Sequence, residues 1–319
     1  AYRDLGDSAK AEAHLAKKGD GEVRLAEPLM AVIQGLSVGQ QKFRQEGQKA
    51  FQEKRFEDAV QAYGRAVAAD PLFADLRVSL AAALVQVGKP AEALEQYELA
   101  TKIAPAHPRA NFGAAFLLQR SGQNAQAAER YRRVLAVEPN NRNAHVNLAQ
   151  TFFEQEDYPA ALAEIDQVLA NDPKDVPMRL ARVGALIAQK RYFDAESTLD
   201  EGLALDGKDP QLLQAQARLL ATSPQAEQRD GGKAVELAET LVNLEKRPEH
   251  VETLAMALAG AGRFEEAIVL QQALIESAKA AERKGLEDAL TATLERYRAG
   301  LPALPPWEKG GPRIEGSGS

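Results

Sequence analysis

FEDAVQAYGRAVAADP, residues 56–71, is the stretch that decides the fold, because its landmarks return at a fixed spacing along the chain. Its closing proline, its first alanine and its tyrosine each recur at one constant interval, which defines the period of the sequence. The recurring positions are Pro71, Pro105, Pro139 and Pro173; Ala59, Ala93, Ala127, Ala161 and Ala195; and Tyr63, Tyr97 and Tyr131. A period of about 34 residues indicates stacked supersecondary units, each of which contacts only its neighbours. We therefore expect a repeat array rather than one globular core.

Within one repeat, small and large residues stand at the points where two helices would cross. We interpret Gly47 and Ala59 as the crossing point, since a larger side chain there would push the helices apart. Tyr63 would fill the space beside the crossing, and Pro71 would end the second helix. The whole set resembles the tetratricopeptide repeat, with matching positions Gly47, Ala50, Phe56, Ala59, Tyr63, Ala66 and Pro71. The resemblance implies an all-α fold, an α-solenoid whose stacked helix–turn–helix repeats form a right-handed superhelix with a C-terminal capping helix.

The resemblance extends over residues 1–299 and predicts their division into repeats. The expected segments are a partial repeat at 1–20, full repeats at 28–73, 74–107, 108–141, 142–175, 176–209, 210–247 and 248–281, and a capping helix at 285–299. The first full repeat opens on one overlong helix from Pro28 to about Glu53. The sixth repeat contains about five extra residues before its second helix, for which Asp230 is the expected N-cap. Because the array starts with half a repeat, we expect this chain to be the C-terminal part of a longer protein.

Proline and glycine dominate the sequence that follows the array, LPALPPWEKGGPRIEGSGS at 301–319. They exclude regular secondary structure. We expect segment 300–319 to be disordered, with its last residues derived in part from an added linker. An open alternative is that the prolines and Trp307 dock back on the array. A role as a short recognition peptide is less favoured.

The bulk composition excludes several classes of function. The chain has 319 residues, of which 45% are hydrophobic and 27% charged, and its net charge is −7. A nucleic-acid partner is not expected, because counterion release requires a basic face. The absence of cysteine removes disulfides, thiolate catalysis and cysteine-bound zinc. No stretch approaches the roughly 18 uncharged apolar residues of a membrane span. The resemblance to tetratricopeptide arrays implies a protein or peptide as the partner.

The sequence contains no recognisable constellation of catalytic or cofactor-binding residues. Its four histidines fall in separate repeats and lack a metal-ligand spacing; they are His14, His107, His145 and His250. Gly231, Gly232 and Lys233 lack the remainder of a phosphate-binding loop, because Ala234 follows where serine or threonine is required. We interpret these three residues as the start of a helix. We therefore expect no enzymatic activity, no metal and no cofactor.

The resemblance also implies where a partner would bind. In tetratricopeptide arrays the first helix of each repeat lines the concave face, and ligand-facing residues recur along it. The matching residues here are Arg44, Gln48, Arg109, Phe112, Phe116, Gln119, Asn143, Asn147, Gln150 and Phe153. The clamp of lysines, arginine and asparagines that holds a C-terminal carboxylate in such arrays is only partly matched, by Arg44, Gln48 and Arg109. That disfavours a carboxylate-tail ligand, although a weaker anion site around Arg44 and Arg109 stays open.

Aromatic and amide side chains stand together in the third and fourth repeats. Phe112 and Phe116 are one helix turn apart and share one helix face. Amides can hydrogen-bond an extended peptide backbone, while aromatic rings bury the side chains of the peptide. Binding of this kind does not depend on the charge of the peptide. The alternative is that the rings pack between neighbouring helices.

These observations predict a non-catalytic scaffold for protein–protein interaction, which binds a peptide or partner segment in the concave groove. Two alternatives remain: a structural array that self-associates into homo-oligomers without a separate ligand, and an accessory domain of a larger enzyme whose catalytic part lies upstream. The C-terminal repeats are similar to those of many long bacterial tetratricopeptide arrays. Many of those arrays resemble exported or lipid-anchored proteins, which favours a periplasmic or exported location over a cytoplasmic one.

Overall fold

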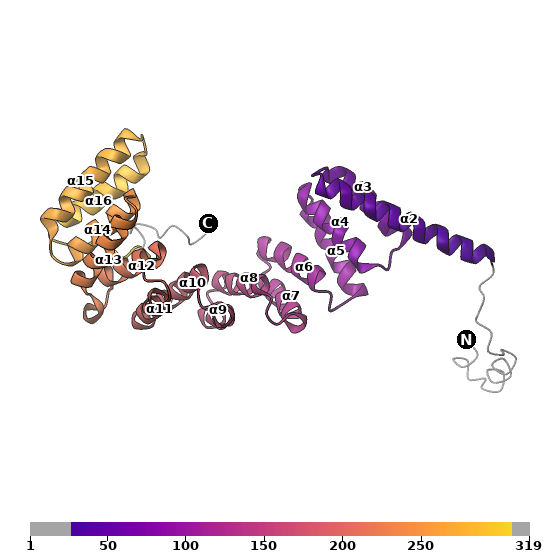
Figure 1. The fold of residues 1–319 in the computed structure, drawn as a ribbon, viewed down its shortest axis with the longest axis horizontal. Helices are drawn as coiled ribbons and strands as arrows, with labels where there is room; N and C mark the ends of the chain where they lie inside the picture. Colours follow the sequence, from indigo (N-terminus) through magenta and orange to yellow (C-terminus); the bar gives the residue numbers. More distant parts are fainter. Residues whose placement is uncertain (1–26, 308–319) are drawn as a thin grey trace, which may run out of the picture. The chain divides into compact units, whose positions relative to one another are not determined.

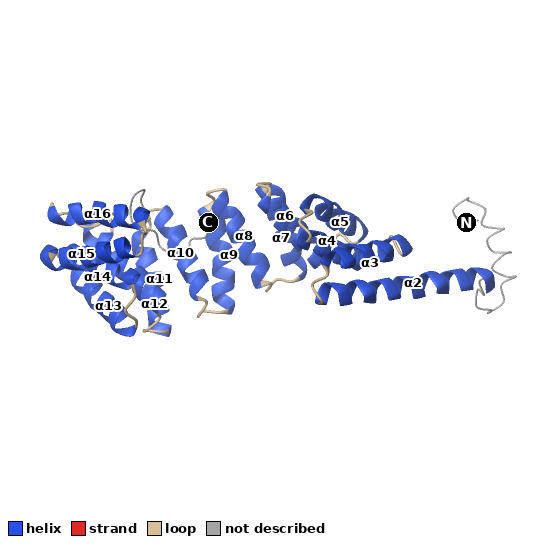
Figure 2. Ribbon diagram, turned by 90° about the horizontal axis from the view of Figure 1, so that it is seen from above, coloured by secondary structure: helices blue, strands red, loops and turns tan. Residues whose placement is uncertain are grey.

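The computed structural model describes residues 27–307, with side chains described from residue 39 onward (Figure 1). The partial repeat expected at residues 1–20 therefore lies outside the described residues. Fifteen α-helices and one short 3₁₀ turn succeed one another in the described part, which contains no β-strand (Figure 2). The expectation of an all-α fold built from stacked helix pairs is confirmed.

The chain divides into two compact units, Ala1–Ala114 (unit 1) and Ala115–Ser319 (unit 2), and the boundary falls inside helix α6. The helices of unit 1 are α2 (Glu27–Gln52), α3 (Phe56–Ala69), α4 (Ala74–Gln86), α5 (Pro90–Ile103) and the first half of α6 (Pro108–Arg120). The helices of unit 2 are the rest of α6, α7 (Asn124–Val137), α8 (Arg142–Glu154), α9 (Tyr158–Asn171), α10 (Val176–Ala188), α11 (Tyr192–Leu205), α12 (Pro210–Thr222), α13 (Gly231–Leu244), α14 (Pro248–Gly260), α15 (Phe264–Ala280) and α16 (Lys284–Arg298).

The helix boundaries keep the period that the sequence shows. The first helices of five successive repeats begin at that same interval, at Ala74, Pro108, Arg142, Val176 and Pro210. The overlong helix expected from Pro28 to about Glu53 is α2. The expected insertion lies between α12 and α13 and holds the 3₁₀ turn Ala226–Gln228. One period after the start of α11 at Tyr192 falls on Ala226, whereas α13 begins only at Gly231.

Small residues let helices approach closely both within a repeat and between neighbouring repeats. In unit 1, a Cβ atom on Gly47 would lie 2.7 Å from the ring of Tyr63, and one on Gly113 would lie 2.3 Å from the ring of Tyr97. Both distances are far below van der Waals contact, so only glycine fits beside these rings. The alanine column of the second helices is fully buried; its members are Ala59, Ala93, Ala127, Ala161 and Ala195.

Side-chain caps at the helix N-termini of unit 2 also follow the period. Asn141, Asp175 and Asp209 precede α8, α10 and α12, and a side-chain oxygen of each accepts from a backbone N–H of the first turn at 2.9–3.1 Å. Such caps satisfy donors that have no partner within the helix. Asp230 caps α13 in the same way, accepting from Lys233 N at 2.9 Å, which confirms the expected N-cap.

A third periodic feature is a left-handed residue after the first helix of each of the first five full repeats. Gly88 and Gly122 occupy this position with φ of 74° and 76°, whereas Lys54, Glu156 and Lys190 occupy it with φ of 57–59°. A side chain with a Cβ is strained in this conformation by about 1–2 kcal/mol, while glycine adopts it readily. Three of these turns therefore retain strain that the others avoid.

Replacing Glu156 with glycine is expected to stabilise unit 2 by about 0.5–1 kcal/mol, because relief of the strain exceeds the extra chain entropy of glycine. The measurement is the urea midpoint followed by circular dichroism. Gly122→Ala is the matched control at the equivalent position and should destabilise by a similar amount. A Glu156→Gly chain that unfolds at lower urea than the parent would contradict the assignment of strain.

The segment after the capping helix differs from the expectation of disorder. Leu301–Trp307 is packed against unit 2, and residues 308–319 lie outside the described part. Gly300, with φ of 71°, ends α16, after which Leu301 N donates to the carbonyl of Arg296 at 2.9 Å. Nε of Arg296 donates in turn to the carbonyl of Pro302 at 2.9 Å. The segment is ordered because Ala303 and Trp307 cover apolar side chains of the array.

Candidate functional site

Unit 1 carries four of the expected site residues. Arg44 and Gln48 are exposed on α2, and Arg109 is exposed in the first turn of α6. Phe112, one turn further along α6, is half-buried. These positions are compatible with contact by a partner, and they stay a prediction.

Arg109 lies close enough to two buried tyrosines to affect the pKa of each. Burial raises the pKa of Tyr63 and of Tyr97, and the positive charge of Arg109 opposes that rise in both. The same two rings cover Gly47 and Gly113. Arg109 therefore places a cation beside the tyrosine column of unit 1.

Unit 2 carries the other six expected residues, and Phe116 is the most exposed of its aromatic ones. The Phe116 side chain is 38% exposed, and the guanidinium of Arg120 lies 5.8 Å from its ring centre. A cation at this distance from a ring face is weakly attracted to it. The pair forms an amphipathic surface at the end of α6.

The amide side chains of Gln119 on α6 and Gln150 on α8 are bonded to one carboxylate. Oε1 of Glu154 accepts from Nε2 of Gln119 at 3.2 Å and from Nε2 of Gln150 at 3.4 Å. The hydroxyl of Tyr131 donates to Oε1 of Gln119 at 3.1 Å. Burial raises the pKa of Tyr131, and the charge of Glu154 acts in the same direction, so the phenol remains a donor. The sequence reasoning missed Glu154; the available signal was its place one helix turn after Gln150.

The two asparagines of α8 differ in exposure. Asn143 is exposed, while Asn147 is half-buried and its Nδ2 donates to the carbonyl of Asn143 at 2.8 Å. One of the two N–H groups of the Asn147 amide is therefore used within its own helix.

Phe153 behaves differently from Phe116. It is half-buried, meets Tyr158 edge to face with ring centres 6.0 Å apart, and packs against the core of α9–α12. For this residue the structure favours packing between neighbouring helices over contact with a ligand.

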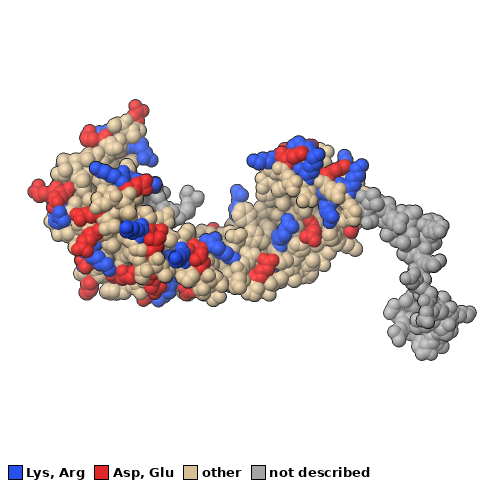
Figure 3. Space-filling model, viewed as in Figure 1, with Lys and Arg blue, Asp and Glu red and all other residues tan. Residues whose placement is uncertain are grey.

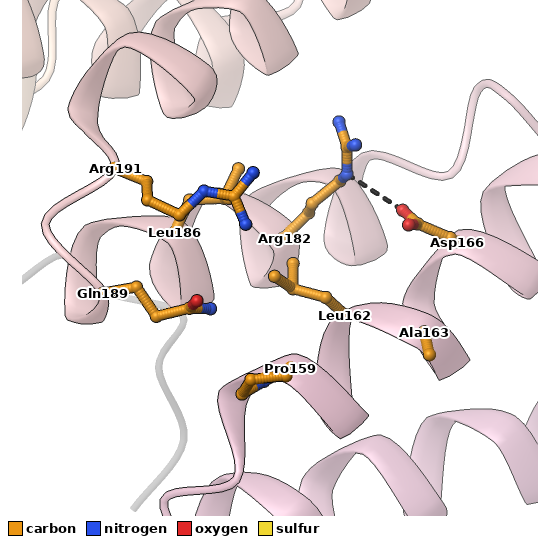
Figure 4. A pocket seen from close by; sticks show the side chains of 8 residues that line it. All are labelled: Pro159, Leu162, Ala163, Asp166, Arg182, Leu186, Gln189 and Arg191. Atoms are coloured by element: carbon orange, nitrogen blue, oxygen red, sulfur yellow. Dashed lines mark ion pairs between the residues drawn. The ribbon is translucent and has the colours of Figure 1, made fainter.

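A cavity of about 300 Å³ lies between α9 and α10 (Figure 4). Its lining residues are Pro159, Leu162, Ala163, Asp166, Arg182, Leu186, Gln189 and Arg191. Nε of Arg182 lies 2.9 Å from Oδ1 of Asp166, and Arg191 pairs with Asp194 at 2.7 Å. Since both arginines are paired with carboxylates, the charges that line the cavity are balanced and do not favour an anion as its ligand.

The histidines make structural contacts in the described part of the chain. His107 lies 3.1 Å from Asp75, His145 lies 2.7 Å from Glu164, and His250 lies 2.6 Å from the carbonyl of Glu245. His14 lies outside the described residues. No group of three or more histidine, aspartate or glutamate side chains comes together among the described residues as metal ligands would.

Charge is distributed without a single-sign patch on the face that carries α13–α16, where acidic and basic side chains alternate (Figure 3). Many of these charges are paired locally, for example Arg263 with Glu266 at 2.6 Å and Lys233 with Asp200 at 3.3 Å. Among the described helices, none combines the length and the apolar character that crossing a membrane demands.

Solved structures with a similar fold include the C-terminal part of a tetratricopeptide repeat-containing protein from Cytophaga hutchinsonii. It is 16% identical with a TM-score of 0.56, over 81% of this chain and 99% of that one. A tetratricopeptide repeat protein from Parabacteroides merdae is 17% identical with a TM-score of 0.52, over 79% of this chain and 99% of that one. The MamA protein is 15% identical with a TM-score of 0.51, over 53% of this chain and 93% of that one. At these identities the likeness concerns the fold alone.

Sequence comparison gives the family. Among curated proteins, none matches this chain. Models described as tetratricopeptide repeat match residues 50–115, 112–176, 152–219 and 248–270. Together these matches cover more than half of the chain and lie within its helical array. The chain belongs to the tetratricopeptide repeat family.

Proposed function

We propose that this chain is a non-catalytic interaction scaffold that binds an extended segment of a protein partner on the surface formed by Phe116 and the amides of α8. The observations that carry the proposal are the exposed ring of Phe116 and, one turn later on α6, the amide of Gln119, which shares the Glu154 carboxylate with Gln150 of α8. The family membership supports a role in protein interaction in general, and the choice of this surface is our inference.

The chemistry of the surface suits a peptide backbone. Gln119 and Gln150 are oriented by hydrogen bonds to Glu154, so their placement requires little ordering when a ligand arrives. Exposed amides can both donate to and accept from an extended backbone, while Phe116 offers area for one apolar side chain of the partner. The Arg120 guanidinium and the Glu154 carboxylate add one charge of each sign. These charges would favour one of the two orientations in which an extended peptide can bind.

Phe116→Ala is expected to weaken binding of a selected peptide by about 30-fold, as the loss of a central aromatic contact of about 2 kcal/mol implies. Peptides are first selected from a random library displayed on phage against the purified chain. Affinities of the selected peptides are then measured by isothermal titration for the parent and the variants.

Phe193→Ala is the matched control, because Phe193 is 55% exposed on the second helix α11, away from the proposed surface. It should leave affinity unchanged, while Asn143→Ala should weaken it by a smaller factor than Phe116→Ala. Equal affinities for the Phe116→Ala chain and the parent, with helicity intact, would refute the proposed surface. Light scattering on the same samples tests whether self-association contributes.

A further inference from the structure

The C-terminal segment Leu301–Trp307 is bound to the array as a peptide would be. Its last aromatic residue packs against the core formed by α9–α12, and the ring centres of Trp307 and Tyr192 are 6.3 Å apart. Pro305, Pro306 and Ala303 are buried. The segment has no helical structure of its own, so its burial comes from the surface that receives it.

The repeat pattern indicates that this surface has a place for an aromatic ring. In the fourth repeat, Phe153 at the end of the first helix meets Tyr158 at the start of the second. In the first repeat of unit 1, Phe51 and Phe56 make the same contact, with ring centres 5.4 Å apart. The position equivalent to Phe153 in the fifth repeat, one period later, is Ile187. The fifth repeat thus has an aliphatic side chain where the fourth has an aromatic ring, and Trp307 brings a ring to this end of α11.

The segment loses little conformational entropy when it binds, because it is rich in proline. Three of its residues, Pro302, Pro305 and Pro306, have a fixed backbone φ. Proline-rich segments in an extended conformation are recognised by aromatic surfaces for this reason. The same chemistry in another polypeptide would suit the surface equally well.

The aromatic end of the bound segment makes no hydrogen bond to the described part of the chain through its indole N–H, so a competing peptide need not replace one there. Nε1 of Trp307 is buried without a hydrogen-bond acceptor among the described residues. A buried donor without a partner lowers the net gain of docking. The tether to α16 depends on Arg296, through its backbone bond from Leu301 and its side-chain bond to Pro302. Neither bond involves the aromatic end of the segment.

We propose that the surface around Tyr192 is a binding site for an extended, proline-rich peptide with an aromatic residue, and that the chain's own Leu301–Trp307 closes it until a partner segment of this chemistry displaces it. The site is separate from the surface around Phe116, so the inference does not rest on the proposed function. The tethered segment competes at a high effective concentration. A partner peptide must therefore bind tightly, or be abundant, to displace it.

The test uses the full chain and the synthetic peptide LPALPPW carrying a fluorescent label. Anisotropy titration is expected to give an affinity for the Trp307→Ala chain roughly tenfold or more above that for the parent, because the competing segment has lost its aromatic anchor. The peptide LPALPPA should bind neither chain. Leu301→Ala is the matched control in the same segment; Leu301 is 47% exposed, and this chain should bind LPALPPW as weakly as the parent does.

A second measurement on the unaltered chain uses Trp307 itself, which is the sole tryptophan of the sequence. Excess LPALPPF should displace the segment and shift tryptophan emission to longer wavelength, while LPALPPA should not. The proposal fails if the Trp307→Ala chain keeps its helicity and binds LPALPPW no better than the parent. It fails equally if LPALPPF leaves the emission of the parent unchanged at saturating concentration. The Phe116→Ala chain should respond as the parent does, which separates this site from the proposed function.

Discussion

Replacing Gly231 with alanine should destabilise the sixth and seventh repeats by about 2 kcal/mol, the difference between two opposing effects. A Cβ atom on Gly231 would lie 2.5 Å from Cα and 2.6 Å from N of Ala261, at the end of α14. Because backbone atoms cannot rotate away, the helices must separate, and overpacking of this kind costs about 3 kcal/mol. Alanine also favours the helix over glycine by up to about 1 kcal/mol, which offsets part of this loss. The clash is the larger effect.

The neighbouring residue provides the control. Gly232 is also in the first turn of α13, but a Cβ atom there would meet only Oδ1 of Asp230, at 3.4 Å. Gly232→Ala should therefore leave stability unchanged or raise it by up to about 1 kcal/mol through helix propensity. Urea unfolding followed by circular dichroism compares the two variants. If both shift the midpoint in the same direction, close backbone contact is not what requires glycine at Gly231.

Gly231 and Gly232 are adjacent in the sequence but have different neighbours. The sequence identified them with Lys233 as the start of a helix, which the structure confirms. It did not distinguish the two glycines, because the need for Gly231 arises from Ala261, which belongs to the following repeat. Lys233 lies 3.3 Å from Asp200, a contact between elements that spacing alone does not reveal.

The regular part of the fold was predictable because it depends on local, repeated interactions. The same helix pair recurs because an alanine lies at the helix crossing, a tyrosine lies beside it in three repeats, and a proline follows the second helix in four repeats. From α3 to α12 the helices start where this pattern requires. The insertion before α13 was predictable for the same reason, since it breaks a period that is otherwise kept.

The site was less predictable, because residues at equivalent spacing have different neighbours. Phe116 and Phe153 were both expected on the ligand-facing stripe, yet Phe116 is exposed beside Arg120 and Phe153 packs on Tyr158. Spacing places both rings on first helices but does not give the side chains of the following helix. The role of Glu154 depends likewise on two glutamines from different helices.

Docking of the C-terminal segment could not be decided from the sequence. Proline excludes helix and strand in LPALPPW, and that exclusion is shared by disordered and docked segments. What distinguishes them is the apolar surface around Tyr192, which is assembled from α9–α12. Whether the segment docks therefore depends on contacts between Trp307 and helices far earlier in the sequence. Local sequence patterns carry no information on such contacts.

The largest effect on stability is expected for Tyr297→Ala, at about 3–5 kcal/mol. Tyr297 is 1% exposed and belongs to a core shared by α12–α16 and the C-terminal segment, together with Met256 and Ala303. Removing its ring leaves a cavity between the capping helix and the last repeat, and the fixed backbone of the neighbouring helices limits collapse into it. In a repeat array a loss at the cap exposes the adjacent repeat, so unfolding should begin there.

Tyr297→Phe separates the ring from the hydroxyl. Burial raises the pKa of Tyr297, and its hydroxyl has no hydrogen-bond partner among the described residues. Removing a buried hydroxyl without a partner should be neutral or stabilise by about 1 kcal/mol, whereas the Ala variant loses the ring as well. Tryptophan emission reports the local consequence, because Trp307 follows Ala303 in the same docked segment. In the Ala variant the emission should shift to longer wavelength at a urea concentration where circular dichroism still shows the remaining repeats folded. Coincident transitions by both probes would instead mean that the cap and the array unfold as one cooperative unit.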